Sequence, residues 1–122
     1  IGLQTLSNTP MAEHTSEIQL WVDLDENRVP ETMRWSAVDS GVDRAQTKAA
    51  QISVWDEKAQ ETLRIDLWTK DMPVDQMKKF VHQNLLALAD TLERAAGEKE
   101  RAGELRQFAL DLGEKLQVLR RQ

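Results

Sequence analysis

The fold of this chain is decided by residues 52–82, which read ISVWDEKAQETLRIDLWTKDMPVDQMKKFVH. Apolar and polar side chains alternate along residues 62–68, and they alternate in the same way along residues 50–55. Alternation with a period of two, rich in β-branched residues, is typical of half-buried strands. The polar residues 56–61 between the two runs are short enough to connect them, so the stretch predicts an antiparallel hairpin.

The pairing of this hairpin follows from its apolar residues. If Val54 lies opposite Leu63, then Ile52 lies opposite Ile65, and the apolar side chains of both strands share one face. A shift of one residue would mix apolar and polar side chains on each face, so the alternation specifies the register strongly.

After the hairpin the hydrophobic period changes from that of a strand to that of a helix. Pro73 fits the first helical turn, where a missing N–H has no intrahelical partner anyway, and Asp71 can cap the first amides. We expect this helix to run from Pro73 to about Ala96 and to end at Gly97. Its apolar residues recur at spacings of three and four, which predicts a single apolar stripe. The stripe comprises Val74, Met77, Val81, Leu85, Leu88, Leu92 and Ala95.

Helical sequence resumes at Glu98 and carries a second apolar pattern, with spacings of four and three over two heptads. This seam comprises Leu105, Ala109, Leu112, Leu116 and Leu119. With Gly97 as the break between them, the two helices are expected to pack side by side as an antiparallel hairpin.

The part of the chain before residue 50 predicts two more strands, at residues 17–25 and 29–37, followed by a loop at 38–47. Residues 1–16 show no sustained period, so we expect a loosely ordered tail, with Met11 as a candidate start and the preceding residues as an upstream extension.

The predicted architecture is therefore an α+β domain, in which a four-stranded antiparallel sheet is followed by two long antiparallel helices. We expect residues 17–122 to form a single domain, with the sheet in 17–69 and the helical hairpin in 73–122. The apolar face of the sheet is expected to be covered by the helices.

The other face of this sheet is the candidate functional surface. It is predicted to carry Trp21, Trp55 and Trp68, together with Arg64 and Asp66. Exposed apolar patches of this kind commonly mark contacts with another chain, so the face is interpreted as a protein interface, more often with a second copy than with a foreign protein. The alternative is that long polar side chains simply cover each indole ring.

Composition excludes several other classes of function. The net charge of −5 disfavours nucleic acid as a partner, and no apolar run approaches the roughly 18–20 residues of a membrane-spanning helix. The chain has no cysteine and two histidines, which leaves no thiolate zinc site and no obvious metal centre. Carboxylates such as Asp23 and Asp66 have no positioned His, Cys or Ser partner, and no glycine-rich phosphate loop is present. We therefore expect no enzymatic activity, no cofactor and no membrane insertion. The absence of cysteine fits a cytosolic protein but also many others.

Three segments carry a family resemblance: residues 16–35, 47–56 and 61–83 closely resemble the gliding-motility protein family GldC. They read SEIQLWVDLDENRVPETMRW, TKAAQISVWD and ETLRIDLWTKDMPVDQMKKFVHQ. The resemblance implies a small cytoplasmic protein associated with the gliding machinery of certain bacteria, and it makes another protein of that machinery a possible partner. It implies no known enzymatic activity and no catalytic residues.

A looser resemblance is architectural. Four antiparallel strands followed by two long helices look like the export chaperone SecB, which implies assembly through sheet edges and helices and apolar surface offered to unfolded proteins. Together these arguments predict a non-enzymatic interaction or scaffold protein that self-associates into a homo-oligomer. A SecB-like holdase is the alternative, and an unrecognised enzyme comes third.

Overall fold

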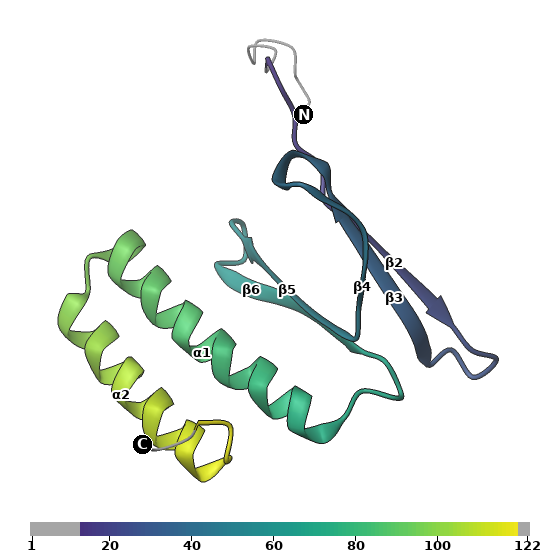
Figure 1. The fold of residues 1–122 in the computed structure, drawn as a ribbon. Helices are drawn as coiled ribbons and strands as arrows, with labels where there is room; N and C mark the ends of the chain where they lie inside the picture. Colours follow the sequence, from purple (N-terminus) through teal and green to yellow (C-terminus); the bar gives the residue numbers. More distant parts are fainter. Residues whose placement is uncertain (1–12, 120–122) are drawn as a thin grey trace. The chain divides into compact units, whose positions relative to one another are not determined.

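A computed structural model describes residues 13–119 of the chain (Figure 1). The chain divides after Lys70 into a unit of strands and a unit of helices. This boundary falls between the predicted strand segment and the predicted helical segment. Of the predicted tail, residues 1–12 lie outside the described part, and residues 13–16 belong to neither a helix nor a strand.

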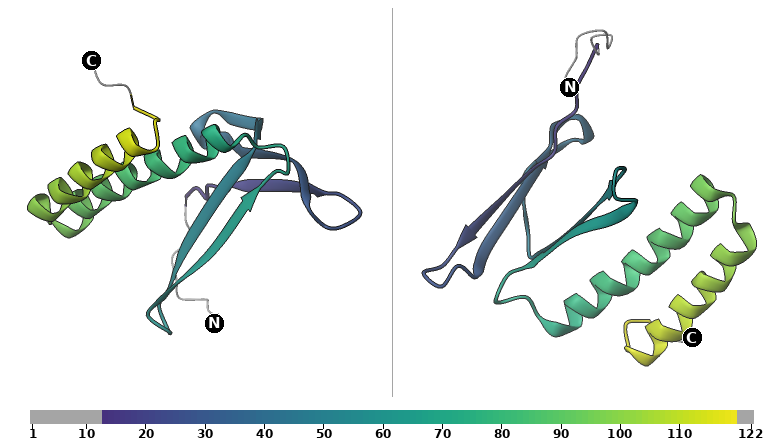
Figure 2. Two further views of the ribbon diagram at one scale, coloured as in Figure 1. Left: turned by 90° about the horizontal axis from the view of Figure 1, so that it is seen from below. Right: turned by 180° about the vertical axis from the view of Figure 1, so that it is seen from behind.

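The first sheet of the strand unit has three antiparallel strands in the order β2-β3-β4 (Figure 2). They span β2 (Gln19–Leu24), β3 (Pro30–Ala37) and β4 (Val42–Thr47). Met33, in the central strand, is the largest fully buried side chain of the described residues, at 2% exposed. Among the described residues of this small sheet, the buried apolar side chains are Met33 and Ala37, so its core is narrow rather than a broad apolar layer.

β4 corrects the prediction of a loop at residues 38–47. That segment contains a short 3₁₀ helix, η1 (Val38–Ser40), followed by the whole of β4. The sequence VDRAQT lacks alternation of apolar residues, so nothing local indicates a strand. The strand exists because β3 provides a partner for it, with Trp35 opposite Ala45 and Met33 opposite Thr47.

The second sheet is the predicted hairpin, formed by β5 (Ala49–Asp56) and β6 (Glu61–Trp68). Its predicted register is confirmed, with Ile52 opposite Ile65 and Val54 opposite Leu63.

The α+β class with antiparallel pairing is confirmed, but the single four-stranded sheet is wrong, because the strands form sheets of three and two. The division occurs at Lys48, the one residue between β4 and β5. Thr47 turns its hydroxyl onto the backbone of Ala49, donating to the carbonyl at 3.0 Å, which marks a local bend of the chain. The strand missed in the sequence takes the edge of β3, and the hairpin continues as a separate ribbon.

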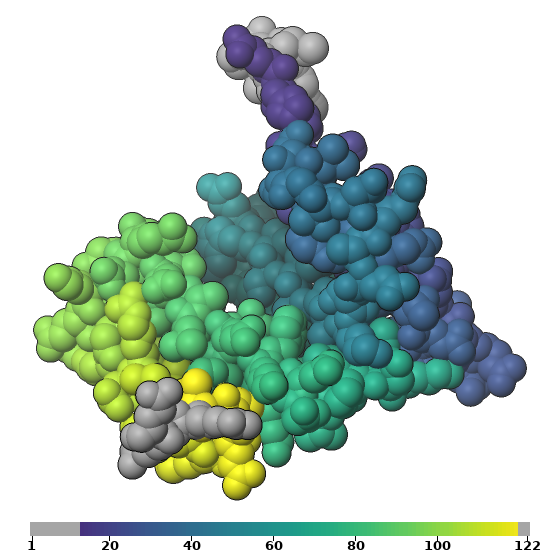
Figure 3. Space-filling model, viewed as in Figure 1, coloured from purple at the N-terminus to yellow at the C-terminus, as the bar shows by residue number. Residues whose placement is uncertain are grey.

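The helical unit consists of α1 (Val74–Ala96) and α2 (Lys99–Lys115), which lie antiparallel (Figure 1). Gly97 closes α1 in a left-handed conformation with φ of 70°, as the sequence predicts. In Figure 3 the side chains of α1 and α2 fill the space between the two helices. Three alanines with no exposed surface lie on these helices, Ala89 on α1 and Ala102 and Ala109 on α2, and their small size allows the helices to approach closely.

This packing differs from the two predicted stripes. On α1 the buried residues are His82 and Ala89, whereas Val81 and Leu88 of the predicted stripe are exposed. The predicted seam on α2 also stops early, because the helix ends at Lys115 and Leu119 lies beyond it, with its N–H bonded to the carbonyl of Gly113 at 3.3 Å.

Candidate interaction surface

The structure brings four of the five predicted interface residues together on one face of the β5–β6 hairpin. Trp55, Arg64, Asp66 and Trp68 point to the same side, because they occupy alternate positions of paired strands. The two indoles are 54–58% exposed. Arg64 donates to the Oδ2 atom of Asp66 through Nε at 3.0 Å and through Nη2 at 2.8 Å. We name these four residues the tryptophan face.

Trp21 lies apart from this face, because its strand, β2, belongs to the three-stranded sheet. The guanidinium of Arg34 lies 5.5 Å from the centre of the Trp21 ring, and its Nη1 atom donates to Asp23 at 2.8 Å. Arg34 thus holds a cation over this indole. For Trp21, this agrees with the alternative interpretation from the sequence, in which a long polar side chain covers the indole ring. Trp21 is therefore not counted as part of it.

The opposite face of the hairpin carries four large apolar side chains, Ile52, Val54, Leu63 and Ile65. Each of them is 40–56% exposed. We name them the aliphatic face. The sequence predicts that the two helices cover this face, and that expectation stays a prediction. An isolated two-stranded hairpin is marginally stable in water, and stability requires further strands or a packed helix. A hairpin with exposed apolar side chains on both faces therefore has surface that favours burial against another element or another chain.

The base of the hairpin is tied to the first sheet by the residues that follow β6. The N–H of Thr69 donates to the carbonyl of Lys48 at 2.8 Å, and the N–H of Lys70 donates to that of Pro30 at 3.0 Å. The Lys70 ammonium also contacts Asp25 at 3.0 Å and Glu31 at 3.2 Å. Sequence reasoning missed this anchor, because Lys70 and Asp25 are 45 residues apart and no local pattern connects them.

This ion pair shifts the titration of both partners. The backbone N–H of Val29 and the ammonium of Lys70 lower the pKa of Asp25 below its usual value. Hydrogen bonds to Asp25 and Glu31 raise the pKa of Lys70. The pair is thus charged across the neutral range, and it holds the base of the hairpin beside the β2–β3 turn.

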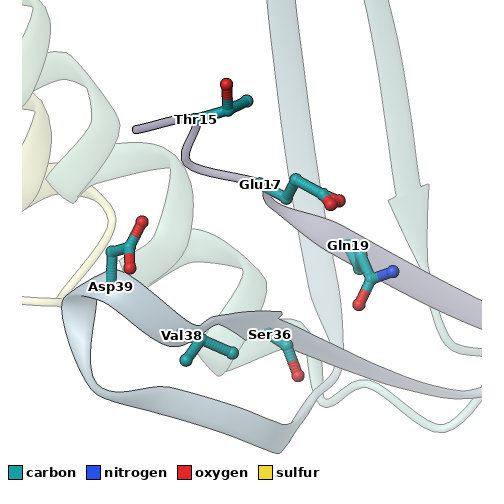
Figure 4. Close-up of a pocket in the computed structure, with 6 residues that line it drawn as sticks. All are labelled: Thr15, Glu17, Gln19, Ser36, Val38 and Asp39. Atoms are coloured by element: carbon teal, nitrogen blue, oxygen red, sulfur yellow. The ribbon is translucent and has the colours of Figure 1, made fainter. Parts of the chain in front are cut away.

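A pocket of about 220 Å³ lies at the other end of the three-stranded sheet. Figure 4 shows that its lining comes from the segment before β2, from β2 itself, from β3 and from η1. The lining residues are Thr15, Glu17, Gln19, Ser36, Val38 and Asp39. The lining is mostly polar, with one valine among polar and acidic side chains.

Ser, His and Asp meet beside this pocket, but not in the order that nucleophilic catalysis requires. The Oδ2 atom of Asp39 accepts from the hydroxyl of Ser16 at 2.5 Å and lies 2.7 Å from Nε2 of His14. In a catalytic triad the imidazole stands between the serine and the carboxylate, where it can accept the serine proton. Here the carboxylate stands in the middle, so His14 is not placed to activate Ser16. The hydrogen bond from Ser16, followed by that from His14, lowers the pKa of Asp39.

The other chemical candidates are also separated. Asp23 is bonded to Thr32 and Arg34 on the first sheet, whereas Asp66 is bonded to Arg64 on the hairpin. No group of three potential metal ligands occurs among residues 13–119. Within the same range, neither helix is long and apolar enough to cross a membrane.

Comparison with known families identifies the chain. The family model described as gliding motility-associated protein GldC-like matches residues 30–118, which run from β3 to just beyond α2. The chain belongs to the GldC-like family. The family resemblance noted in the sequence is thereby confirmed, and the match includes the whole β5–β6 hairpin of this GldC-like chain. The comparisons with curated proteins and with solved structures found no match. The architectural likeness to SecB stays a prediction.

Proposed function

We propose that this GldC-like chain is a gliding-motility-associated interaction protein of the cytoplasm, which acts without catalysis and self-associates through its β5–β6 hairpin. The observation that carries the proposal is the exposure of the two indole side chains of the tryptophan face, Trp55 at 58% and Trp68 at 54%. A second copy or another protein of the motility machinery would complete the burial that two strands cannot provide alone.

The tryptophan face is the part of the hairpin best suited to supply affinity. Indole side chains bury about 150–250 Å² each, so covering the exposed parts of Trp55 and Trp68 removes roughly 200 Å² from water. At about 25 cal/mol per Å² this corresponds to roughly 5 kcal/mol before the costs of association. Arg64 and Asp66, on the same face, would fix the orientation of the partner more than its affinity.

Light scattering over a range of protein and salt concentrations tests this proposal. We expect a discrete oligomer that persists at high salt, because apolar burial is not screened by ions. Trp55→Ala combined with Trp68→Ala is expected to reduce the mass while leaving the helix and strand content, measured by circular dichroism, nearly unchanged. Phe108→Ala is the matched control, since Phe108 lies on α2 and is as exposed as Trp55, at 58%. A wild-type monomer at every concentration, or a double variant that assembles like the wild type, would contradict the proposal.

A holdase is the second candidate, favoured by the exposed indole side chains of the tryptophan face, which would suit contacts with unfolded chains. Such a protein would bind many unfolded chains weakly and suppress their aggregation. Turbidity of a heat-denatured model enzyme, measured with and without the protein, separates the two candidates. Suppression at near-stoichiometric ratios, lost in the double tryptophan variant, would favour the holdase over the scaffold.

A further inference from the structure

The order of charged and apolar side chains along β6 indicates how a second copy would pair with the outer edge of this strand. The hairpin contains two strands, so in the part of the chain that the structure describes β6 has a strand partner on one side only. Alternate backbone N–H and C=O groups of the other edge point outward and can pair with an added strand. The inference drawn from this edge rests on the proposed self-association, and it specifies which strands pair and in which register.

Two copies of β6 can pair antiparallel about a twofold axis, and the faces of the hairpin restrict where the axis lies. Directly opposite residues of an antiparallel pair point to the same side of the sheet. An axis through a residue therefore keeps both aliphatic faces on one side of the combined sheet. An axis between two residues would set apolar side chains opposite polar ones and mix the faces.

Charge then selects one residue for the axis. An axis at Arg64 sets two guanidinium groups opposite each other, and an axis at Asp66 does the same with two carboxylates. Like charges directly opposite are destabilising. An axis at Leu63 shortens the pairing and sets Ile65 against Glu61. An axis at Ile65 pairs residues 62–68 along nearly the whole strand and sets Arg64 opposite Asp66 of the second copy, twice by symmetry.

We propose that two copies of this chain pair edge to edge through β6, about a twofold axis at Ile65, and so form a four-stranded antiparallel sheet in the order β5-β6-β6-β5. The intrastrand pair of Arg64 and Asp66, at 2.8 Å, would then become part of a network of four charges. Charge would not favour one register over another if two copies paired through β5, because the only charged residue of that strand is Asp56 at its end.

The paired sheet also joins each face of the hairpin to the same face of the second copy. On the aliphatic side, Leu63 lies opposite Leu67 of the second copy, and the two Ile65 side chains meet at the axis. On the tryptophan side, each Thr62 lies between Trp55 of its own hairpin and Trp68 of the second copy. Four strands with a continuous apolar face satisfy the requirement for independent stability that a two-stranded hairpin does not meet.

Charge reversal tests the axis. Arg64→Asp alone sets carboxylate against carboxylate at both charged positions, and Asp66→Arg alone sets guanidinium against guanidinium. Each single variant is expected to weaken the dimer roughly tenfold to hundredfold. An equimolar mixture of the two variants is expected to recover association, because both opposite pairs become attractive. A chain with both substitutions is expected to dimerise like the wild type, which also shows that the substitutions leave the fold intact. Lys79→Glu, at an exposed position of α1, is a control for charge reversal away from this edge.

Cross-linking gives a second measurement, since the chain contains no cysteine. Opposite Cα atoms of an antiparallel pair are about 4.5–5.5 Å apart, which is within the range that a disulfide spans. Ile65→Cys is therefore expected to form a disulfide-linked dimer under mild oxidation. Ile52→Cys is the matched control, because it lies on the same face, but two copies of it would be roughly 14 Å apart, across three strand spacings.

The outcomes separate the axis from self-association in general. A wild-type oligomer whose dissociation constant is unchanged in both single variants, with no faster cross-linking at position 65 than at position 52, would overturn pairing through β6 and leave self-association to another surface. A monomeric wild type at every concentration would overturn both. Recovery in the mixture together with cross-linking at position 65 would support the axis at Ile65.

Discussion

Two glycines of α2 provide a sharp test of how the helices pack. A Cβ atom added at Gly113 would lie 2.7 Å from Nε2 of His82 and 2.7 Å from Cδ1 of Leu119. Both distances are shorter than a Cβ contact tolerates, and the His82 ring is only 3% exposed, so it has little room to move away. A Cβ atom at Gly103, in the same helix, would meet nothing within 4 Å.

The two substitutions by alanine should therefore have different consequences. Alanine is favoured over glycine within a helix by about 1 kcal/mol, so Gly103→Ala is expected to stabilise the protein by roughly 0.5–1 kcal/mol. Gly113→Ala makes the same gain but overpacks the contact with His82, which costs about 1–3 kcal/mol. Its net effect is expected to lie between about zero and about 2.5 kcal/mol of destabilisation. The difference between the variants corresponds to roughly 4–12 °C in thermal midpoint for a chain of this size.

Thermal unfolding followed by circular dichroism at a helical wavelength measures this difference directly. Adding His82→Ala to Gly113→Ala removes the ring that the new methyl group would touch, so the cost of Gly113→Ala should shrink in that background. If Gly113→Ala is as stabilising as Gly103→Ala, the close contact between α1 and α2 at this point does not exist, and the packing described for the helical hairpin is wrong.

Three further expectations concern the strand unit. Met33→Ala should destabilise it by about 2–5 kcal/mol, because Met33 is buried at 2% exposed; urea unfolding followed by tryptophan fluorescence measures the loss, and a change below 1 kcal/mol would place the core elsewhere. Acid should weaken the same unit, because the pKa values of Asp23, Asp25 and Asp39 are lowered in the folded chain. Their contribution is complete above the usual aspartate pKa near 3.8 and is lost as the pH falls through the lowered values, so stability that rises on acidification in this window would contradict the assignments. Lys70→Met should loosen the base of the hairpin without unfolding the first sheet, so amide exchange should accelerate in β5 and β6 more than in β2 and β3; uniform exchange rates would argue against the anchor.

Local pattern was sufficient for the elements that carry a strong period. The register of the hairpin was predictable because a shift of one residue would move every apolar side chain to the opposite face. The end of α1 was predictable because Gly97 adopts a left-handed conformation that other residues rarely take. The candidate surface followed in part, since alternation places Trp55, Arg64 and Trp68 on one face whatever lies around the hairpin.

The rest depended on contacts that no local pattern contains. β4 has no strand signal of its own and is held in place by β3. The grouping of Trp21 with the tryptophan face was wrong because it assumed a single sheet. The strands instead divide into two sheets at Lys48, the one residue between β4 and β5. On α1, helical periodicity identifies a broad apolar surface but not the part that faces α2; small residues such as Ala89 decide that, because they allow the closest approach of two helix axes.

The sequence by itself determined the kinds of elements, the pairing of the hairpin and the family of this chain, because these depend on side-chain period and on residue identities that can be read in order. Only the tertiary structure decided that the strands divide into two sheets, that Arg34 covers Trp21, and that Lys70 anchors the base of the hairpin. The physical reason is the same in each case. These features depend on groups far apart in the sequence, whose interaction exists only after the chain has brought them together.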